Sequence, residues 1–227
     1  LEKNPLAPGH TREDYEKRVD FELNEDQQML KGLVEKFVDD RYDLTRRLGY
    51  QRDSQGFSAE NWRLLADIGL LALPFPEAHG GLEGDCVSTI TVMEVLGAGL
   101  VAEPYLSDIV IAARLIATAG RDAQKEQWLP RIIAGEARAT LAHFEHEARF
   151  NLPYVATTAQ NGEINGTKTM VLAGAGVDAY LVSARNGGSR AGHDAKPGRI
   201  DRGDRQFRRQ QRQQFGLRKR HAQHTAI

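Results

Sequence analysis

Residues 126–145 read EQWLPRIIAGEARATLAHFE, and within this stretch the pattern of the sequence changes from helix to strand. In its first half, apolar residues recur on one helical face: Trp128, Leu129, Ile132 and Ile133. Gly135 marks the end of that helix, because glycine readily adopts the conformation that follows a last helical turn. The remainder has the composition of a short strand. The stretch therefore predicts a helical region followed by a β region.

Upstream of this stretch, the sequence predicts two amphipathic helices with recognisable caps. Asn24 and Gln27 form a capping box at the start of the first helix. Its expected buried face consists of Met29, Leu30, Leu33, Val34, Phe37 and Val38. Ser58 caps the second helix, which ends at Gly69. Its expected buried face consists of Trp62, Leu65 and Ile68.

Two further segments are apolar nearly all round the helical wheel. They read DCVSTITVMEVLGAGL (residues 85–100) and PYLSDIVIAARLIATAG (residues 104–120). A helix with apolar residues on every side is typical of the interior of a protein. We therefore expect two core helices, and we expect Cys86 to lie in the core with the first of them.

The region after Gly135 predicts four short strands. They lie in ATLAHFEHEA (139–148), NLPYVATTAQ (151–160), GEINGTKTMVLA (162–173) and VDAYLVSAR (177–185). Turn signals at Asn161-Gly162 and at Gly174–Gly176 separate them and favour antiparallel pairing. Four such strands without a closing partner leave open edges, so we expect an incomplete β domain.

The fold class predicted is α+β: an all-α N-terminal domain, then an incomplete antiparallel β domain, then a disordered basic tail. The expected segments are a disordered leader (1–19), the helical domain (20–136), a partial middle β domain (137–185) and the tail (186–227).

The tail differs from the rest of the chain in charge. The whole chain carries a formal net charge of -1, yet residues 186–227 contain 11 Lys and Arg against 3 Asp and Glu. The favoured interpretation is translation in a wrong reading frame after Arg185, because the change falls inside a β domain. A nucleic-acid-binding arm is a less favoured interpretation, and an ordinary disordered extension is a third.

The remaining composition favours a cytoplasmic protein. No run of 18 apolar residues suggests a membrane span, and the N-terminus lacks the apolar segment of a secretory signal. The single cysteine, Cys86, cannot form an internal disulfide and fits a reducing compartment.

The order of elements and several motifs resemble the acyl-CoA dehydrogenase family. The resemblance covers residues 20–185 and is carried by LLALPFPEAHGGLEGD (70–85), the stretch 126–145 and NGEINGTKTMVLAGAGVDAYLVSAR (161–185). DFELNEDQQMLKGLVEKFVDDRYD (20–43) and LVAEPYLSDIVIAARLI (100–116) resemble most the small subunits of enzymes of the pimeloyl-CoA dehydrogenase type.

This resemblance implies α,β-desaturation of an acyl-CoA thioester, with FAD accepting the hydride and an electron-transfer flavoprotein accepting the electrons. It also implies a homo-oligomer, or a hetero-oligomer with a large acyl-CoA dehydrogenase subunit. The family's catalytic glutamate lies in a C-terminal helical domain that this sequence does not contain, so no catalytic residue is assigned.

The resemblance also suggests binding residues. The cofactor-binding candidates are Ala142, His143, Phe144, Glu145, Phe150, Met170 and Leu172. The substrate-binding candidates are Tyr105, Ile109 and Phe150. The family's Thr-Glu-Pro aligns with residues 144–146, its Gly-Ser-Asp with 149–151 and its Trp-Ile-Thr with 170–172, and among these only Glu145 matches.

Three hypotheses of function follow. The first is an acyl-CoA dehydrogenase subunit that is inactive as a fragment. The second is a non-catalytic partner that stabilises a large subunit, which the loss of the flavin-contacting hydroxyls favours. The third and weakest is nucleic-acid binding through the tail. No metal site is expected, because HFEHE (143–147) does not supply a closed set of ligands.

Overall fold

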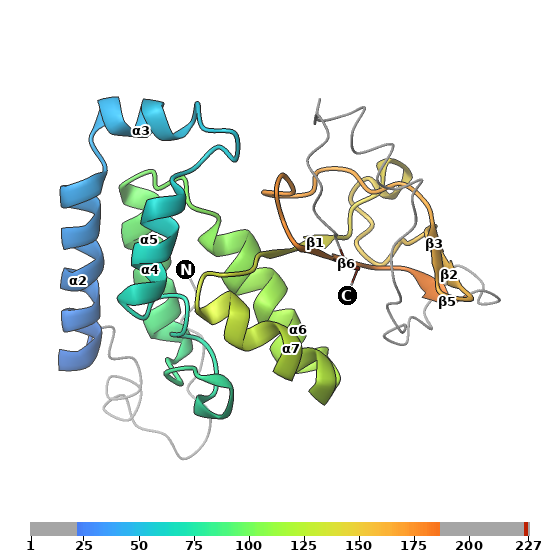
Figure 1. Cartoon of the computed structure of the whole chain (residues 1–227), viewed down its shortest axis with the longest axis horizontal. Coiled ribbons are helices and arrows are strands. Elements are labelled where there is room, and N and C mark those ends of the chain that lie inside the picture. The colour runs from blue at the N-terminus through green and yellow to red at the C-terminus, as the bar shows by residue number, and fades with distance from the viewer. Residues whose placement is uncertain (1–21, 187–224, 227) are drawn as a thin grey trace, which may run out of the picture.

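The structure is a computed structural model that describes residues 22–186 and 225–226 (Figure 1). The expected leader (1–19) and nearly all of the expected tail lie outside the described residues. Within them, helices gather at one end of the molecule and strands at the other. The last helix ends at Ile133 and the first strand begins at Ala139, so the predicted order of a helical domain followed by strands is confirmed.

The helical part contains more segments than the sequence predicted. Its α-helices are α2 (Glu25–Arg41), α3 (Leu44–Tyr50), α4 (Ala59–Asp67), α5 (Cys86–Ala98), α6 (Arg114–Ala119) and α7 (Asp122–Ile133). A 3₁₀ turn, η1 (Glu77–His79), precedes α5, and a π-helix, η2 (Tyr105–Ala113), runs directly into α6. The short helix α3 was not predicted, and neither was the π-helical form of residues 105–113.

The predicted helix caps are present. The backbone N–H of Gln27 donates to Asn24 Oδ1 at 2.8 Å, and the N–H of Asn24 donates to Gln27 Oε1 at 3.1 Å, which confirms the capping box. The hydroxyl of Ser58 accepts from Asn61 N–H at the start of α4. Gly69 follows α4 with a φ of +81°, a left-handed conformation that glycine adopts without strain.

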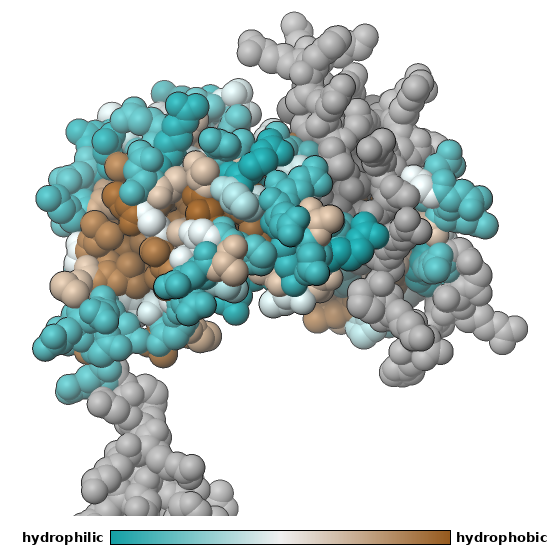
Figure 2. All heavy atoms as spheres, turned by 60° about the horizontal axis from the view of Figure 1, so that its bottom comes forward, coloured by the Kyte–Doolittle hydropathy of each residue, from teal (hydrophilic) through white to brown (hydrophobic). Residues whose placement is uncertain are grey.

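The predicted buried faces of α2 and α5 are too wide. On α2, Val34 and Phe37 are buried, but Met29 is 67% exposed and Leu33 is also exposed. On α5, Val87 and Ile90 are exposed, and Cys86 is exposed as well instead of lying in the core. Both helices pack on one side only, and Figure 2 shows the resulting apolar surface over the helical part of the molecule.

The helical core is built around α4, the segment that follows it, η2 and α7. Its largest fully buried side chains are Leu65, Leu70, Leu71, Phe75, Tyr105, Ile109, Ile116, Leu129 and Ile132. The predicted face of α7 is therefore correct at Leu129 and Ile132, and Trp128 is buried too. This core extends to β1 through Ala139, so the helices support the start of the β part.

The β part contains two small sheets. One has the order β1 (Ala139–Ala142), β4 (Ala179–Val182), β6 (Thr225–Ala226), and the other has the order β3 (Glu163–Asn165), β2 (Thr158–Gln160), β5 (Arg185–Asn186). β2 and β3 form the expected antiparallel hairpin, with Asn161 and Gly162 both at positive φ in its turn.

The other strand pairs are parallel rather than antiparallel. β1 pairs with β4, β2 with β5 and β4 with β6 in parallel register. Parallel neighbours need a long connection, and residues 143–178 provide one between β1 and β4. The edge of β4 that was expected to stay open is paired with β6. No helix among the described residues is both long and apolar enough to cross a membrane.

Candidate functional site

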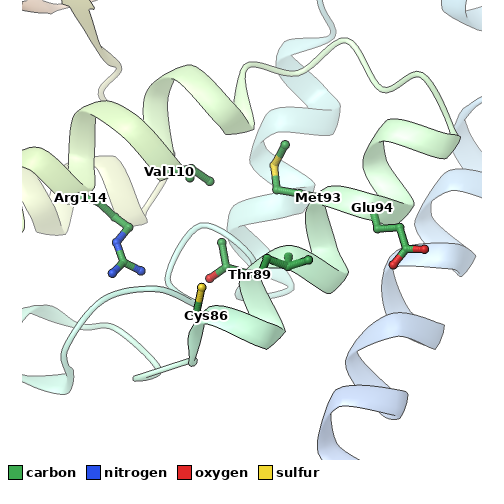
Figure 3. A pocket seen from close by; sticks show the side chains of 7 residues that line it. Cys86, Thr89, Met93, Glu94, Val110 and Arg114 are labelled. Atoms are coloured by element: carbon green, nitrogen blue, oxygen red, sulfur yellow. The ribbon is translucent and has the colours of Figure 1, made fainter. Parts of the chain in front are cut away.

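A hollow of about 550 Å³ lies between α5 and η2. It is lined by Cys86, Thr89, Ile90, Met93, Glu94, Val110 and Arg114. Figure 3 shows Met93 between the two helices and Arg114 extending toward the side where Cys86 lies, while Glu94 points away. The lining is mostly apolar, and its two charged side chains are Arg114 and Glu94, of which Glu94 points away. Such a lining suits an apolar ligand chain that carries a polar or anionic end.

A second, smaller hollow of about 290 Å³ continues along η2 toward its N-terminus. It is lined by Arg47, Met93, Leu96, Gly97, Leu100, Val101, Glu103, Tyr105 and Leu106. Met93 lines both hollows, so the two adjoin at this flexible side chain. We call the two adjoining hollows the channel between α5 and η2. Most of its lining residues are apolar, and its charged ones are Arg47, Glu94, Glu103 and Arg114.

The structure does not gather the three substrate-binding candidates in one place. Tyr105 lines the smaller hollow, is buried, and donates its hydroxyl to the carbonyl of Leu70 at 3.0 Å. Ile109 is buried in the helical core and lines neither hollow. Phe150 is fully exposed after the 3₁₀ turn η3 (His146–Ala148) and lines neither hollow. Of the three candidates, only Tyr105 therefore lines one of the two hollows.

Glu103 is the carboxylate of the smaller hollow. It is buried, and its oxygens accept hydrogen bonds from the hydroxyl of Tyr42 and, at 3.3 Å, from the N–H of Ser58. Burial raises the pKa of Glu103 above its usual value, and these hydrogen bonds oppose that rise only in part. Next to this group, both amide atoms of buried Asn61 lack a hydrogen-bond partner within the described part of the chain. The hollow thus holds a carboxyl that can be protonated more easily than an ordinary one.

The cofactor-binding candidates separate into buried and exposed residues. Ala142 is buried in the β core, and Glu145 is buried in an ion pair. His143 bonds through Nδ1 to Ser183 Oγ at 3.0 Å and through Nε2 to the carbonyl of Leu152 at 2.8 Å. The other four candidates are all exposed and lie outside the strands: Phe144, Phe150, Met170 and Leu172.

We call the exposed residues Phe144, Met170 and Leu172 the apolar face. The carbonyl of Phe144 accepts from Thr169 N–H at 2.8 Å, so the segments that carry these side chains run side by side. Met170 and Ala173 both have a left-handed backbone although neither is glycine. Such residues cost about 1–3 kcal/mol each and persist only where other contacts hold them. The apolar face is therefore a constrained surface without hydroxyl groups.

A buried ion pair lies behind the apolar face. Lys168 Nζ donates to Glu145 Oε1 at 2.7 Å, to Ser183 Oγ at 2.9 Å and to the carbonyl of His143 at 3.1 Å. Glu145 also accepts from the hydroxyl and N–H of Thr157 and from the N–H of Ala156. Lys168 is thus not a solvated surface charge, since its side chain is fully buried.

This network controls the ionisation of Glu145. Burial alone would raise its pKa, but the hydrogen bonds from Lys168, Thr157 and the backbone outweigh burial and lower the pKa to about 2. Burial lowers the pKa of Lys168, and Glu145 opposes that effect. The pair is charged at neutral pH.

We expect acid to destabilise the fold through Glu145. A carboxyl with a lowered folded pKa contributes stability that is fully present above its unfolded value of 4.5 and is lost as the pH falls toward 2, here about 2–3 kcal/mol. Urea unfolding of the wild type and of Glu145→Gln between pH 7 and pH 3 measures this. The difference between the two proteins should shrink below pH 4.5, and a difference independent of pH would contradict the prediction.

The sequence prediction missed a second buried pair, Asp108 with Arg138. Arg138 Nε donates to Asp108 Oδ2 at 2.7 Å, and both side chains are almost completely buried. Burial raises the pKa of Asp108 to about 6 in spite of the guanidinium beside it. A signal was available, because an aspartate inside the apolar segment 104–120 is buried only where a partner compensates its charge.

The chain is similar in sequence to known proteins. Residues 24–136 match the family described as acyl-CoA dehydrogenase, N-terminal domain. The chain is 32% identical over 166 residues to acyl-CoA dehydrogenase FadE27 of Mycobacterium tuberculosis, an alignment that covers 73% of this chain and 44% of FadE27. It is 30% identical over 176 residues to acryloyl-CoA reductase (NADH) of Anaerotignum propionicum, covering 74% and 44%.

Solved structures are also similar to this chain over about the same share of its length. The ChsE4-ChsE5 complex from Mycobacterium tuberculosis matches with a TM-score of 0.67 and 30% identity, covering 74% of this chain and 46% of that chain. The Tcur3481-Tcur3483 steroid ACAD G363A variant matches with a TM-score of 0.66 and 28% identity, covering 73% and 46%. The chain thus spans a little under half the length of these relatives.

Proposed function

The chain belongs to the acyl-CoA dehydrogenase family through its N-terminal domain, and from this premise we propose that it is a subunit of a two-component, FAD-dependent acyl-CoA dehydrogenase. In this proposal the chain supplies a helical wall for the acyl group. A large partner subunit supplies the polar contacts to the flavin and the catalytic base. The assignment to the pimeloyl-CoA dehydrogenase type belongs to the same proposal.

The proposal of a partner subunit rests on the residues of the apolar face. In the family pattern, threonine hydroxyls stand where Phe144 and Leu172 stand here, and neither of these side chains has a group that can donate to a flavin oxygen or nitrogen. The apolar part of an isoalloxazine could contact Met170 and Leu172, but its polar edge finds no partner on them. These residues do not fit a complete flavin site.

Two similar structures are named for pairs of proteins: the ChsE4-ChsE5 complex and Tcur3481-Tcur3483. Their likeness to this chain supports an assembly of two different subunits. The reaction proposed is α,β-desaturation of an acyl-CoA thioester, with electron-transfer flavoprotein as the acceptor of the electrons. The channel between α5 and η2, with its apolar lining and Arg114 at the rim, supports an acyl thioester as the ligand.

The flavin content of the purified chain tests whether a partner subunit supplies the contacts to FAD. We expect the full chain purified alone to carry substoichiometric FAD by absorbance near 450 nm. Addition of an acyl-CoA such as octanoyl-CoA should still shift the amide and methyl NMR signals of residues that line the channel. A yellow preparation with one FAD per chain would overturn the partner role. Absence of any acyl-CoA binding would overturn the role as a substrate wall.

Restoring hydroxyl groups should restore part of the flavin affinity. We expect the double variant Phe144→Thr/Leu172→Thr to bind FAD about 5- to 150-fold more tightly than the wild type, because two hydrogen bonds at about 0.5–1.5 kcal/mol each would form. Leu152→Thr is the matched control, since Leu152 is an exposed apolar residue of the same region outside the aligned positions. Equal FAD affinity in the double variant and the control, measured by flavin fluorescence titration, would contradict the prediction.

The alternative of nucleic-acid binding rests on the tail, which lies almost entirely outside the described residues. No observation on the described part of the chain favours it.

A further inference from the structure

Arg138 joins three parts of the molecule that are far apart in the sequence. Besides its ion pair with Asp108 in η2, its guanidinium donates to the carbonyl of Ala173 at 3.2 Å and to that of Ala175 at 3.3 Å. The guanidinium carbon also lies 4.6 Å from the centre of the Phe57 ring, in the segment before α4. An arginine that is buried and uses its fork of donors in this way fixes the relative positions of its partners.

The helix η2 presents different residues to Arg138 and to the channel. Leu106 lines the smaller hollow and Val110 lines the larger one, which Arg114, the first residue of α6, also lines. Asp108, within the same two turns, is fully buried, and its Oδ2 accepts from Arg138. Its Oδ1 accepts from the hydroxyl of Ser107 at 2.8 Å. A ligand in the channel would therefore press on the same short helix that holds Asp108.

Residues 105–113 form a π-helix rather than an α-helix. The N–H of Arg114 donates to the carbonyl of Ile109, five residues earlier, whereas an α-helix would use the carbonyl four residues earlier. π-helical turns are rare and occur frequently at functional sites. Conversion to an α-helix would change the register of η2 and displace Asp108 with respect to Arg138.

The loop of residues 171–176 is the segment that Arg138 holds on the side away from Asp108. Besides the two bonds from Arg138, two further side chains donate to carbonyls of this loop. The hydroxyl of Thr140 donates to the carbonyl of Leu172 at 2.7 Å, and the hydroxyl of Tyr180 donates to the carbonyl of Gly174 at 2.6 Å. Leu172 at the start of this loop belongs to the apolar face. Movement of Arg138 would therefore change the constraint on that face.

We propose that Asp108 and Arg138 are a positioning pair that couples occupancy of the channel between α5 and η2 to the conformation of loop 171–176 and of the apolar face. This inference rests on the proposed function, and it adds a route by which an acyl group in the channel alters the surface offered to flavin or partner. Thr140 and Tyr180 hold the same loop through their own hydroxyl hydrogen bonds to Leu172 and Gly174, whereas Arg138 also forms the ion pair with Asp108 in η2.

Hydrogen exchange of the full chain tests the coupling without flavin, acyl-CoA or a partner. Val110→Trp fills the channel from η2 and takes the place of a ligand. Leu115→Trp is its control, because Leu115 is exposed on α6 and lines neither hollow. We expect Val110→Trp to change the exchange rates of the amides in loop 171–176 about 2- to 30-fold, the usual range for coupled sites. Leu115→Trp should leave them unchanged.

The same measurement is repeated with Arg138→Met and with Thr140→Val. Both should speed exchange in the loop, but only Arg138→Met should abolish the response to Val110→Trp. If Arg138→Met does not fold by near-ultraviolet circular dichroism, Asp108→Asn replaces it, with the same expected loss of response. A response that persists in these variants, or the absence of any response in the wild-type background, would overturn the coupling. Neither result depends on whether the chain binds FAD, so failure here is distinct from failure of the proposed function.

Discussion

Replacement of Lys168 by methionine is expected to lower the free energy of unfolding by about 3–5 kcal/mol, the usual effect of removing one member of a buried ion pair. Glu145 would keep its hydrogen bonds from Thr157 and Ala156 but lose the Lys168 ammonium that compensates its charge. The carbonyl of His143 and the hydroxyl of Ser183 would lose a donor in the same change. Chemical denaturation at pH 7 measures the loss.

Lys125→Met is the matched control. Lys125 lies 3.9 Å from Asp122 in an ion pair at the surface of α7, where such pairs contribute about 0–1 kcal/mol. A double variant, Glu145→Gln with Lys168→Met, should recover part of the loss, because it leaves no unpaired charge in the interior. If Lys168→Met and Lys125→Met destabilised the protein equally, Lys168 would not be part of a buried network.

The second large effect is expected at Gly81, in the turn between η1 and α5. A Cβ atom added there would lie 1.9 Å from the carbonyl oxygen of Phe75 and 2.2 Å from its carbonyl carbon. That oxygen also accepts from Glu83 N–H at 2.8 Å, so the backbone cannot give way without losing a bond. We expect Gly81→Ala to destabilise the fold by more than about 3 kcal/mol, at the upper end of single substitutions.

Gly97→Ala should instead stabilise the fold. Gly97 lies near the end of α5, is exposed, and has no atom within 4 Å of an added Cβ. Alanine at a helical position stabilises by about 0.5–1 kcal/mol relative to glycine. Thermal unfolding of the two variants separates the effects. A small loss at Gly81 would mean that the turn of Gly80 and Gly81 adapts to a side chain.

Local signals predicted the features that depend on neighbours in the sequence. The capping box of Asn24 and Gln27, the cap at Ser58 and the turn at Asn161-Gly162 each involve groups two to four residues apart, and all three are present. The order of helices and strands followed from the change of period near Gly135. The alignment with family motifs identified the same domain that the comparisons found.

The features that could not be predicted depend on long-range packing. Periodicity shows that α5 is apolar all round, but it does not show that other elements cover only one side and leave Ile90 exposed. The partners Asp108 and Arg138 are 30 residues apart, and Glu145 and Lys168 are 23 apart, so spacing gives no indication that they meet. The parallel pairing of β1 with β4 depends on the path of a long connection rather than on either strand.

The positions of the three methionines provide the protein with intrinsic spectroscopic reporters. Met29 lies on the exposed side of α2, Met93 at the junction of the two hollows, and Met170 on the apolar face. Isotope labelling of the methionine methyl groups would give three resonances, each from a different surface, without any substitution. An acyl chain that enters the channel should perturb Met93 first, a subunit that covers the apolar face should perturb Met170, and a contact on the outer side of the helices should perturb Met29.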